Sequence, residues 1–242
     1  MAEWTESEEA DGREQHREPD PCNDDTIAYY KFDRSYRDVC FGNNGFGVQY
    51  SFSDFGISNR AAVFDFSALS VPSLNGYEWG STFSISLWFR TSGFRKQQGG
   101  LINNLNVTTI NASTANETQT VITGSWDIFV KKDETRKQRL GATIVTSHAN
   151  KTWDDIAMIR AHHWYHLAMT YDGETINFYL NNHLVLSDSQ CCHGDIVSTN
   201  TDVVIGRNYN EVLFDGYIDE MKLFKKALTA QEITKLYQLK VV

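Results

Sequence analysis

Short alternations of apolar and polar residues run along most of the chain. From Phe83 to Arg90 an apolar residue stands at every second position, the period-two pattern of a strand with one buried face. Turn residues such as Asp172-Gly173 and Asn181-Asn182 separate similar segments. The predicted strands are 27–32, 61–66, 83–90, 101–102, 125–130, 140–145, 164–171, 175–180, 184–186, 203–206 and 214–224. This succession predicts an all-β protein, an antiparallel two-sheet sandwich of the jelly-roll type.

The periodicity changes only near the C-terminus. Thr229 and Glu232 have the spacing of a capping box, in which each side chain accepts a hydrogen bond from the other residue's backbone N–H. Ile233, Leu236 and Leu239 then recur with helical spacing. We therefore predict one short helix after the last strand.

The first 25 residues differ from the rest of the chain. They contain ten acidic residues, two arginines and almost no apolar residue, so we predict a solvated, disordered arm over residues 1–25. The remainder, 26–242, is predicted to be one domain. With 41% hydrophobic and 13% aromatic residues the chain can bury a core, and single sandwich domains commonly reach this size.

Charge and hydropathy exclude some functions. The chain carries 22 Lys and Arg against 31 Asp and Glu, a net charge of -9, without a basic cluster. Such a surface repels phosphate backbones, so we expect no nucleic-acid partner. No segment approaches the roughly 18 consecutive apolar residues of a membrane span.

A set of short motifs occurs in a fixed order along the chain. They are 164–173, 179–185, 205–206, 214–224 and 227–233 in the last third, together with 28–33 and 83–88 near the start. With these segments the chain resembles the laminin-G-like, concanavalin-A-like jelly-roll family. No single motif decides it, but their order and spacing match the family over residues 26–240. Pentraxins and legume lectins are similar in architecture. Physically, Trp164 and Tyr171 are expected to anchor the core between the sheets.

Sequons and cysteines bear on the cellular compartment. Asn106, Asn111, Asn116 and Asn150 begin N-glycosylation sequons, and the first three lie in a polar stretch that we expect to be an exposed loop. No signal peptide is visible at the N-terminus. We nevertheless expect a secreted glycoprotein whose signal is missing from this sequence.

The four cysteines, Cys22, Cys40, Cys191 and Cys192, allow three pairings. A bond between the adjacent pair closes a small strained ring and is disfavoured. We expect Cys22 and Cys40 each to bond one member of the adjacent pair, or to bond each other. The weaker alternative is a metal site made by Cys40, Cys191, Cys192 and His193. It lacks the C-x₂-C spacing of zinc modules, and adjacent ligands fit a tetrahedron poorly.

The carboxylates do not form the pattern of a glycosidase, which needs two of them facing each other across the bond to be cut. Asp127 stands alone in its strand, Asp133-Glu134 falls in a turn, and Asp219-Glu220 points to opposite faces. We expect no enzymatic activity. A glycan-processing enzyme on the same fold, with scattered carboxylates, is the alternative.

The family resemblance implies a structural Ca²⁺ site that joins the first long loop to the last strand. The matching residues are Asp33, Asp38 and Asp219. Alternation along strand 217–224 places Asp219 on a buried face, where it needs a cation or several N–H donors. Besides Ca²⁺, the candidate partners are backbone amides and the loop residues Arg34 and Arg37.

These features predict a non-catalytic extracellular recognition module. We expect its loops and concave face to bind a glycan or a matrix protein, in cell adhesion or extracellular-matrix assembly. An intracellular scaffold is the remaining alternative if the sequons are unused.

Overall fold

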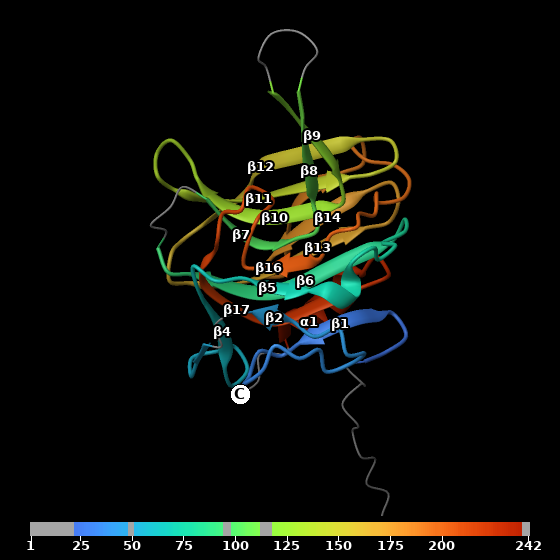
Figure 1. The fold of residues 1–242 in the computed structure, drawn as a ribbon. Helices are drawn as coiled ribbons and strands as arrows, with labels where there is room; N and C mark the ends of the chain where they lie inside the picture. The colour runs from blue at the N-terminus through green and yellow to red at the C-terminus, as the bar shows by residue number, and fades with distance from the viewer. Residues whose placement is uncertain (1–21, 48–50, 94–97, 112–117, 239–242) are drawn as a thin grey trace, which may run out of the picture.

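A computed structural model describes residues 22–47, 51–93, 98–111 and 118–238 of the protein. Two large antiparallel sheets form a sandwich (Figure 1), which confirms the predicted all-β jelly roll with a short C-terminal helix. Most of the acidic arm, residues 1–21, and the sequon residue Asn116 lie outside the described residues. Among the described residues, none of the helices combines the length and apolar character needed to cross a membrane.

The first sheet has eight strands in the order β15-β14-β13-β6-β17-β4-β3, with β1 also paired to β17. They are β1 (Thr26–Tyr30), β3 (Phe52–Ser53), β4 (Ala61–Asp65), β6 (Phe83–Thr91), β13 (Trp164–Tyr171), β14 (Ile176–Leu180), β15 (His183–Asp188) and β17 (Asp215–Phe224). The chain thus brings its first strand beside its last.

The second sheet has seven strands in the order β12-β11-β10-β7-β16-β5-β2. They are β2 (Phe46–Gly47), β5 (Leu69–Val71), β7 (Gln98–Asn103), β10 (Trp126–Lys132), β11 (Gln138–Val145), β12 (Asn150–Ile159) and β16 (Val203–Ile205). A short 3₁₀ helix, Pro72–Leu74, follows β5. Strand β12 is absent from the predicted set because its many polar residues obscure the alternation along this sheet edge.

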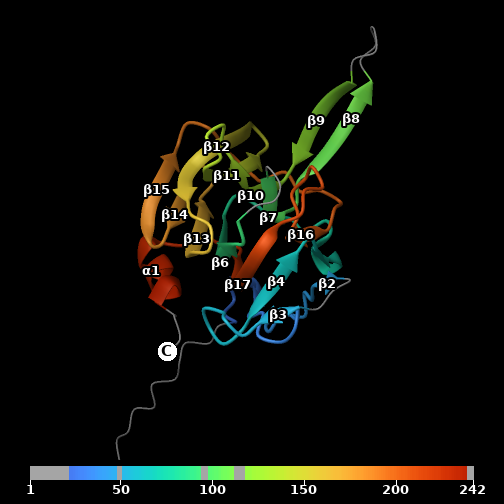
Figure 2. The same ribbon diagram turned by 90° about the vertical axis from the view of Figure 1, so that its left-hand side faces the viewer.

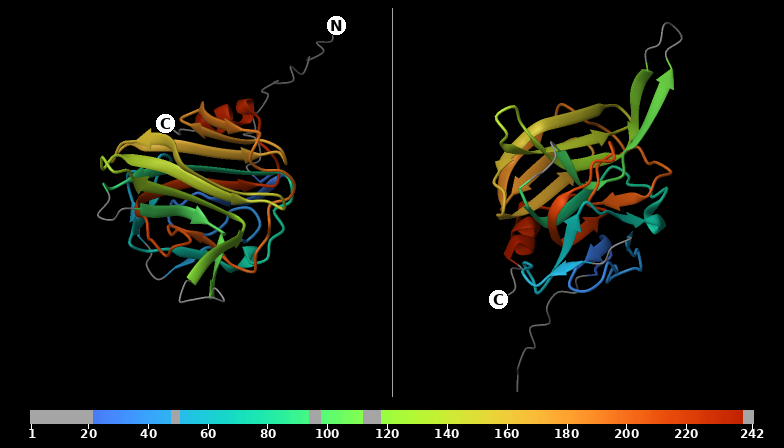
Figure 3. Two further views of the ribbon diagram at one scale, coloured as in Figure 1. Left: turned by 90° about the horizontal axis from the view of Figure 1, so that it is seen from above. Right: turned by 60° about the vertical axis from the view of Figure 1, so that its left-hand side comes forward.

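The sequon-rich stretch was predicted to be an exposed loop. This prediction was wrong, because the stretch contains a hairpin. Strands β8 (Asn106–Asn111) and β9 (Thr118–Gly124) pair with each other and project from the sandwich (Figures 2 and 3). Their threonine, valine and isoleucine residues favour the extended backbone, although the segment is polar overall. Asn106 and Asn111 therefore lie in β8, and Asn150 begins the edge strand β12.

The core lies between the two sheets, and strand alternation decides which aromatic residues enter it. Trp126 and Phe83 stack at 5.4 Å from the facing sheets, with Trp79 against both. Tyr171 is fully buried there, as predicted. The prediction for Trp164 was wrong: being seven residues before Tyr171, it faces the opposite side of β13 and contacts Tyr217.

Helix α1 (Ala230–Gln238) covers the outer face of the eight-stranded sheet, beside β13 (Figure 2). Ile233 packs there with Ala168 and Phe224. The predicted capping box is present: Glu232 N–H donates to Thr229 Oγ1 at 3.3 Å, and Thr229 N–H donates to Glu232 Oε2 at 2.8 Å. The switch from strand to helical periodicity thus marks a real element.

The disulfides join Cys22 to Cys40 and Cys191 to Cys192. The first is one of the predicted alternatives, whereas the expectation that the adjacent pair would not bond internally was wrong. Strand order explains this result. Cys22 precedes β1, which pairs with β17, whereas Cys191 follows β15, four strand positions from β17. At about 4.8 Å per strand, these segments are too far apart for a bond between them.

Candidate functional site

The loop after β1 is organised around Asp38. Its carboxylate accepts four backbone N–H groups, from Tyr29 at 2.8 Å, Cys40 and Phe41 at 2.9 Å, and Asn43 at 3.0 Å. Only 7% of the residue is exposed. A carboxylate that accepts several N–H groups holds a turn strongly, because each bond is charge-assisted. Asp38 therefore acts as the structural centre of this loop.

Further bonds tie the same loop to β1. The Tyr30 hydroxyl donates to the Asn43 carbonyl at 2.5 Å, and the Asn43 side-chain amide donates to the Ile27 carbonyl at 2.9 Å. The Cys22–Cys40 disulfide closes the other side. The loop is consequently preorganised, which lowers the entropic cost of binding a ligand.

Asp219, on β17, is completely buried. Its carboxylate accepts N–H groups from Ile57 at 2.7 Å, Ser58 at 3.3 Å and Glu220 at 3.0 Å. Burial raises its pKa to about 8, although the bonds from Ile57 and Ser58 oppose that shift. Backbone amides, one of the predicted kinds of partner, thus hold this residue.

Gly56 is required beside this carboxylate. A Cβ atom there would lie 2.4 Å from the Arg60 carbonyl carbon and 2.9 Å from Asp219 Oδ2. No side chain fits at such distances. The glycine lets the loop between β3 and β4 reach the buried carboxylate with its own N–H groups.

The three predicted calcium ligands bind separate sets of backbone N–H groups. Asp33 accepts the Arg60 N–H at 3.2 Å, and Asp38 and Asp219 accept the N–H groups described above. The described residues contain no group of three or more His, Cys, Asp or Glu side chains able to hold a metal ion. Segment 57–60 presents N–H groups to Asp33 and Asp219, whereas Ca²⁺ needs oxygens. Calcium binding therefore stays a prediction.

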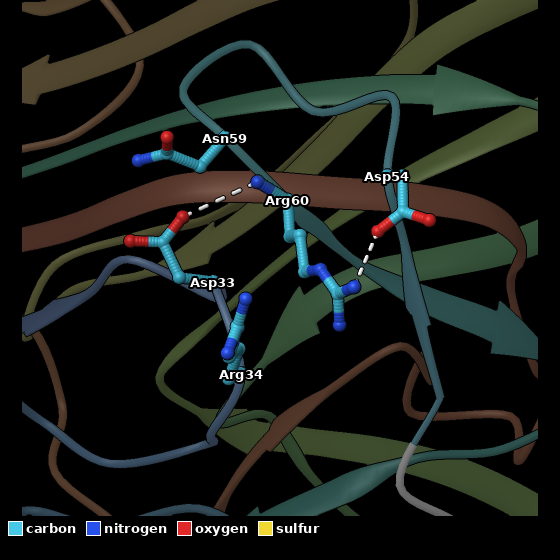
Figure 4. A pocket seen from close by; sticks show the side chains of 5 residues that line it. All are labelled: Asp33, Arg34, Asp54, Asn59 and Arg60. Carbon is cyan, nitrogen blue, oxygen red and sulfur yellow. Dashed lines mark hydrogen bonds and ion pairs between the residues drawn. The ribbon is translucent and has the colours of Figure 1, made fainter.

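Two cavities open at this end of the molecule. The first, of about 410 Å³, is lined by Asp33, Arg34, Asp54, Asn59 and Arg60 (Figure 4). Asp33 and Arg34 come from the loop after β1, and the other three come from the loop between β3 and β4. Arg60 pairs with Asp54 at 2.6 Å. The wall thus offers both hydrogen-bond donors and acceptors.

The second cavity, of about 580 Å³, lies against the loop after β1 and shares Arg34 with the first. Its other lining residues are Ser35, Tyr36, Arg37, Asp38, Gly42, Asn44, Gly45 and Phe46. We call residues 33–46 and 54–60, which surround both cavities, the loop end.

Exposed apolar side chains gather at the loop end. Of the seven large hydrophobic residues that are exposed in the described part of the chain, four lie here: Val39, Phe41, Phe46 and Phe55. Phe55 is 77% exposed. Aromatic rings beside a polar cavity are typical of ligand sites. These four residues are absent from the sites predicted from the sequence. The sequence signal for them is the presence of aromatic residues inside segments rich in Gly, Ser and Asn.

On the outer face of the seven-stranded sheet, unlike at the loop end, the carboxylate of Asp127 is covered by another segment of the chain. Asp127 alternates with the core residues Trp126 and Ile128, so it points away from the core, yet it is completely buried. The segment after β16 covers this face: Asn103 Nδ2 donates to the Arg207 carbonyl at 3.2 Å. Burial raises the pKa of Asp127 well above its usual value, and the Tyr209 backbone N–H opposes this only partly. Because it is completely buried, Asp127 is closed to a ligand on this face.

Comparisons with known proteins support the fold. The family model of the concanavalin A-like lectin/glucanases superfamily matches residues 65–234, more than half of the chain. A search of curated proteins finds no match.

Solved structures match over most of the chain at low identity. Domain 4 of AbnA, an extracellular GH43 arabinanase from Geobacillus stearothermophilus, solved with arabinotriose, is 22% identical with a TM-score of 0.61; the match covers 88% of this chain and 98% of that domain. The binding domain of Paraclostridial Mosquitocidal Protein 1 is 18% identical with a TM-score of 0.59. The match covers 88% of this chain and 52% of that chain. A structure of botulinum neurotoxin type C, a toxin whose cell entry depends on interaction with two ganglioside molecules, is 13% identical with a TM-score of 0.53. The match covers 90% of this chain and 52% of that chain. The chain spans about half of the two toxin chains.

Proposed function

Because the chain belongs to the concanavalin A-like lectin/glucanases superfamily, we propose that it is a non-catalytic carbohydrate-recognition module whose ligand binds at the loop end. The observation that carries the proposal is the pair of adjoining cavities that share Arg34, beside the exposed ring of Phe55. Sugar hydroxyls need both donors and acceptors, which Arg60, Asp54 and Asn59 supply. Sugar rings also have apolar faces that pack on aromatic side chains.

We ascribe a binding role without catalysis to the chain because of how its carboxylates are engaged. A glycosidase needs two carboxyl groups, about 5–10 Å apart, on either side of the scissile bond. Asp127 is sealed beneath the segment after β16. The two carboxylates that line the first cavity both bind Arg60: Asp33 accepts its backbone N–H, and Asp54 pairs with its guanidinium. The match to one domain of an arabinanase supports carbohydrate binding, since that domain was solved with arabinotriose.

The proposal includes an extracellular location, with a role in cell adhesion or matrix assembly. The Cys22–Cys40 disulfide supports it, because disulfides persist in oxidising compartments. Asn106 and Asn111 on the projecting hairpin, and Asn150 on an edge strand, are the proposed sites of N-glycosylation.

A glycan-array screen of the full chain, with and without Ca²⁺, tests the proposed function. We expect the wild type to retain a restricted set of saccharides, and the Asp54→Ala/Phe55→Ala variant to lose them. Met158→Ala is the matched control, since Met158 is exposed on β12, at the far end of the second sheet. Failure of the wild type to retain any saccharide, or equal binding by the loop-end variant, would contradict the proposal.

A further inference from the structure

The cavity lined by residues 34–46 has an unusual charge for this acidic protein. Arg34 and Arg37 both line it, both are exposed, and neither forms an ion pair within the described residues. The nearest carboxylate on the wall, Asp38, already accepts four backbone N–H groups. Two arginines thus line a cavity in which the carboxylate of Asp38 is already bound to backbone N–H groups.

The neighbouring groups suit a ligand that bears acceptors. Asn44 Oδ1 accepts the Asp38 N–H at 3.1 Å. This bond uses the oxygen of the Asn44 side chain and not its NH₂ group. Ser35 adds a hydroxyl. Phe46 forms an apolar edge and is 58% exposed. Donors therefore outnumber acceptors on this wall, beside one aromatic ring.

We propose that this cavity binds an anionic saccharide, with Arg34 and Arg37 holding its sulfate or carboxylate groups and Phe46 packing on a sugar ring. The inference rests on the proposed carbohydrate function and names its ligand class. Guanidinium groups pair with such anions through two parallel hydrogen bonds. A neutral sugar offers the two guanidinium groups no such charge-assisted hydrogen bond.

The whole-molecule charge favours a saccharide chain over an anionic membrane. At a net charge of -9 the protein is repelled by an extended negative surface. A flexible saccharide chain can place a few of its charges in the cavity and hold the others away from the acidic remainder of the protein. Binding to anionic lipid is accordingly the outcome that the test must exclude.

The experiment measures binding of the full chain to four probes: chondroitin sulfate, its chemically desulfated form, dextran, and phosphatidylserine vesicles. Calorimetry at low and high salt gives each dissociation constant. We expect chondroitin sulfate to bind most tightly, and its binding to weaken with salt, because screening weakens such contacts. If the desulfated chain, which keeps its carboxylates, binds as tightly, then carboxylates are the recognised groups and the inference holds.

Variants then locate the site. Arg34→Ala/Arg37→Ala should weaken binding of the charged chain by at least about tenfold, a loss of roughly 1.4 kcal/mol. Phe46→Ala should weaken it less. Arg160→Ala, an exposed arginine after β12, removes a charge far from the cavity and should bind as the wild type does. Thermal melting checks that each variant is folded.

The outcomes separate this inference from the proposed function. If dextran binds as tightly as the charged chains and the double variant binds normally, the anionic preference is wrong while carbohydrate binding stands. If a glycan array also retains nothing, both fail. If only vesicles bind, the ligand is a lipid surface and the inference is overturned.

Discussion

Three buried carboxylates show how differently one fold treats the same side chain. Asp38 accepts four N–H groups and Asp219 accepts three. Neither oxygen of Asp127 has a well-formed hydrogen bond, and its pKa is raised well above the usual value by burial. Since an unpaired buried charge is costly, these residues should respond differently to substitution.

Asp38→Ala should lower the free energy of unfolding by about 2–4 kcal/mol, because four N–H groups lose a charged acceptor. Urea denaturation measures this difference. Asp54→Ala is the control: the Asp54 side chain is 72% exposed and paired only at the surface, so its loss should cost less than about 1 kcal/mol. Equal effects of the two substitutions would show that Asp38 does not organise the loop.

Asp127→Asn should stabilise the protein at neutral pH. The folded-state pKa of Asp127 is raised above its unfolded value, so the wild type is favoured at low pH and loses stability as pH rises above about 4. The variant cannot ionise and escapes this loss. We expect its melting temperature at pH 7 to exceed that of the wild type by at least about 2 °C, the shift for roughly 1 kcal/mol in a chain of this size.

The advantage of Asp127→Asn should shrink as the pH falls toward 3. Asp155→Asn, at an exposed carboxylate with 64% of its side chain accessible, should show no comparable gain. An advantage that is independent of pH would mean that the pKa of Asp127 is the same in the folded and unfolded states, contrary to its burial.

At the scale of elements, the two disulfides should contribute unequally. Cys22 and Cys40 are 18 positions apart, and their bond joins the segment before β1 to the loop after β1. Cys191 and Cys192 are adjacent, so their bond restricts the unfolded chain very little. In the loop-entropy model the first bond is worth about 3 kcal/mol. Cys22→Ala/Cys40→Ala should lower the unfolding free energy by about that amount.

Peptide mapping under non-reducing conditions checks the connectivity behind this prediction. Cys22 and Cys40 should appear in one linked pair of peptides, and Cys191 and Cys192 within a single peptide. A peptide that joins Cys22 or Cys40 to the adjacent pair would contradict the strand arrangement described here.

The calcium prediction also belongs to this scale, since it concerns a link between the first long loop and β17. The family resemblance leads us to expect that a chelator lowers the melting temperature of the wild type and leaves Asp219→Ala unchanged. Differential scanning calorimetry of both proteins decides the question. Unchanged melting of the wild type would mean that the N–H groups of Ile57 and Ser58 suffice for Asp219.

At the scale of the whole molecule, the proposed ligand site differs in charge from the rest of the chain. The chain is strongly acidic, yet Arg34, Arg37 and Arg60 collect with exposed aromatic rings at one end of the sandwich. The projecting β8–β9 hairpin, with its sequons, lies elsewhere (Figure 1). Glycans attached to that hairpin would leave the loop end accessible.

The sequence by itself determined the fold class, most strand positions and the C-terminal helix. The reason is local: period-two alternation, turn residues and a capping box each depend on residues within a few positions of one another. Such patterns do not depend on distant segments. Asp219 is buried as predicted, but the alternation behind that prediction is interrupted: a register shift between Asp219 and Lys222 lets Ile218 and Met221 both enter the core.

Tertiary structure alone decided the cysteine pairing, the partners of Asp219 and the composition of the loop end. Each depends on which distant segments become neighbours. Gly56 lets the N–H groups of Ile57 and Ser58 reach Asp219 on β17. Arg34 and Arg60 line one cavity although they belong to different loops, and their spacing in the sequence does not predict this. Strand order likewise separates Cys191 from Cys22. Local periodicity carries no information on such long-range contacts, so the site became visible only once the sheets were assembled.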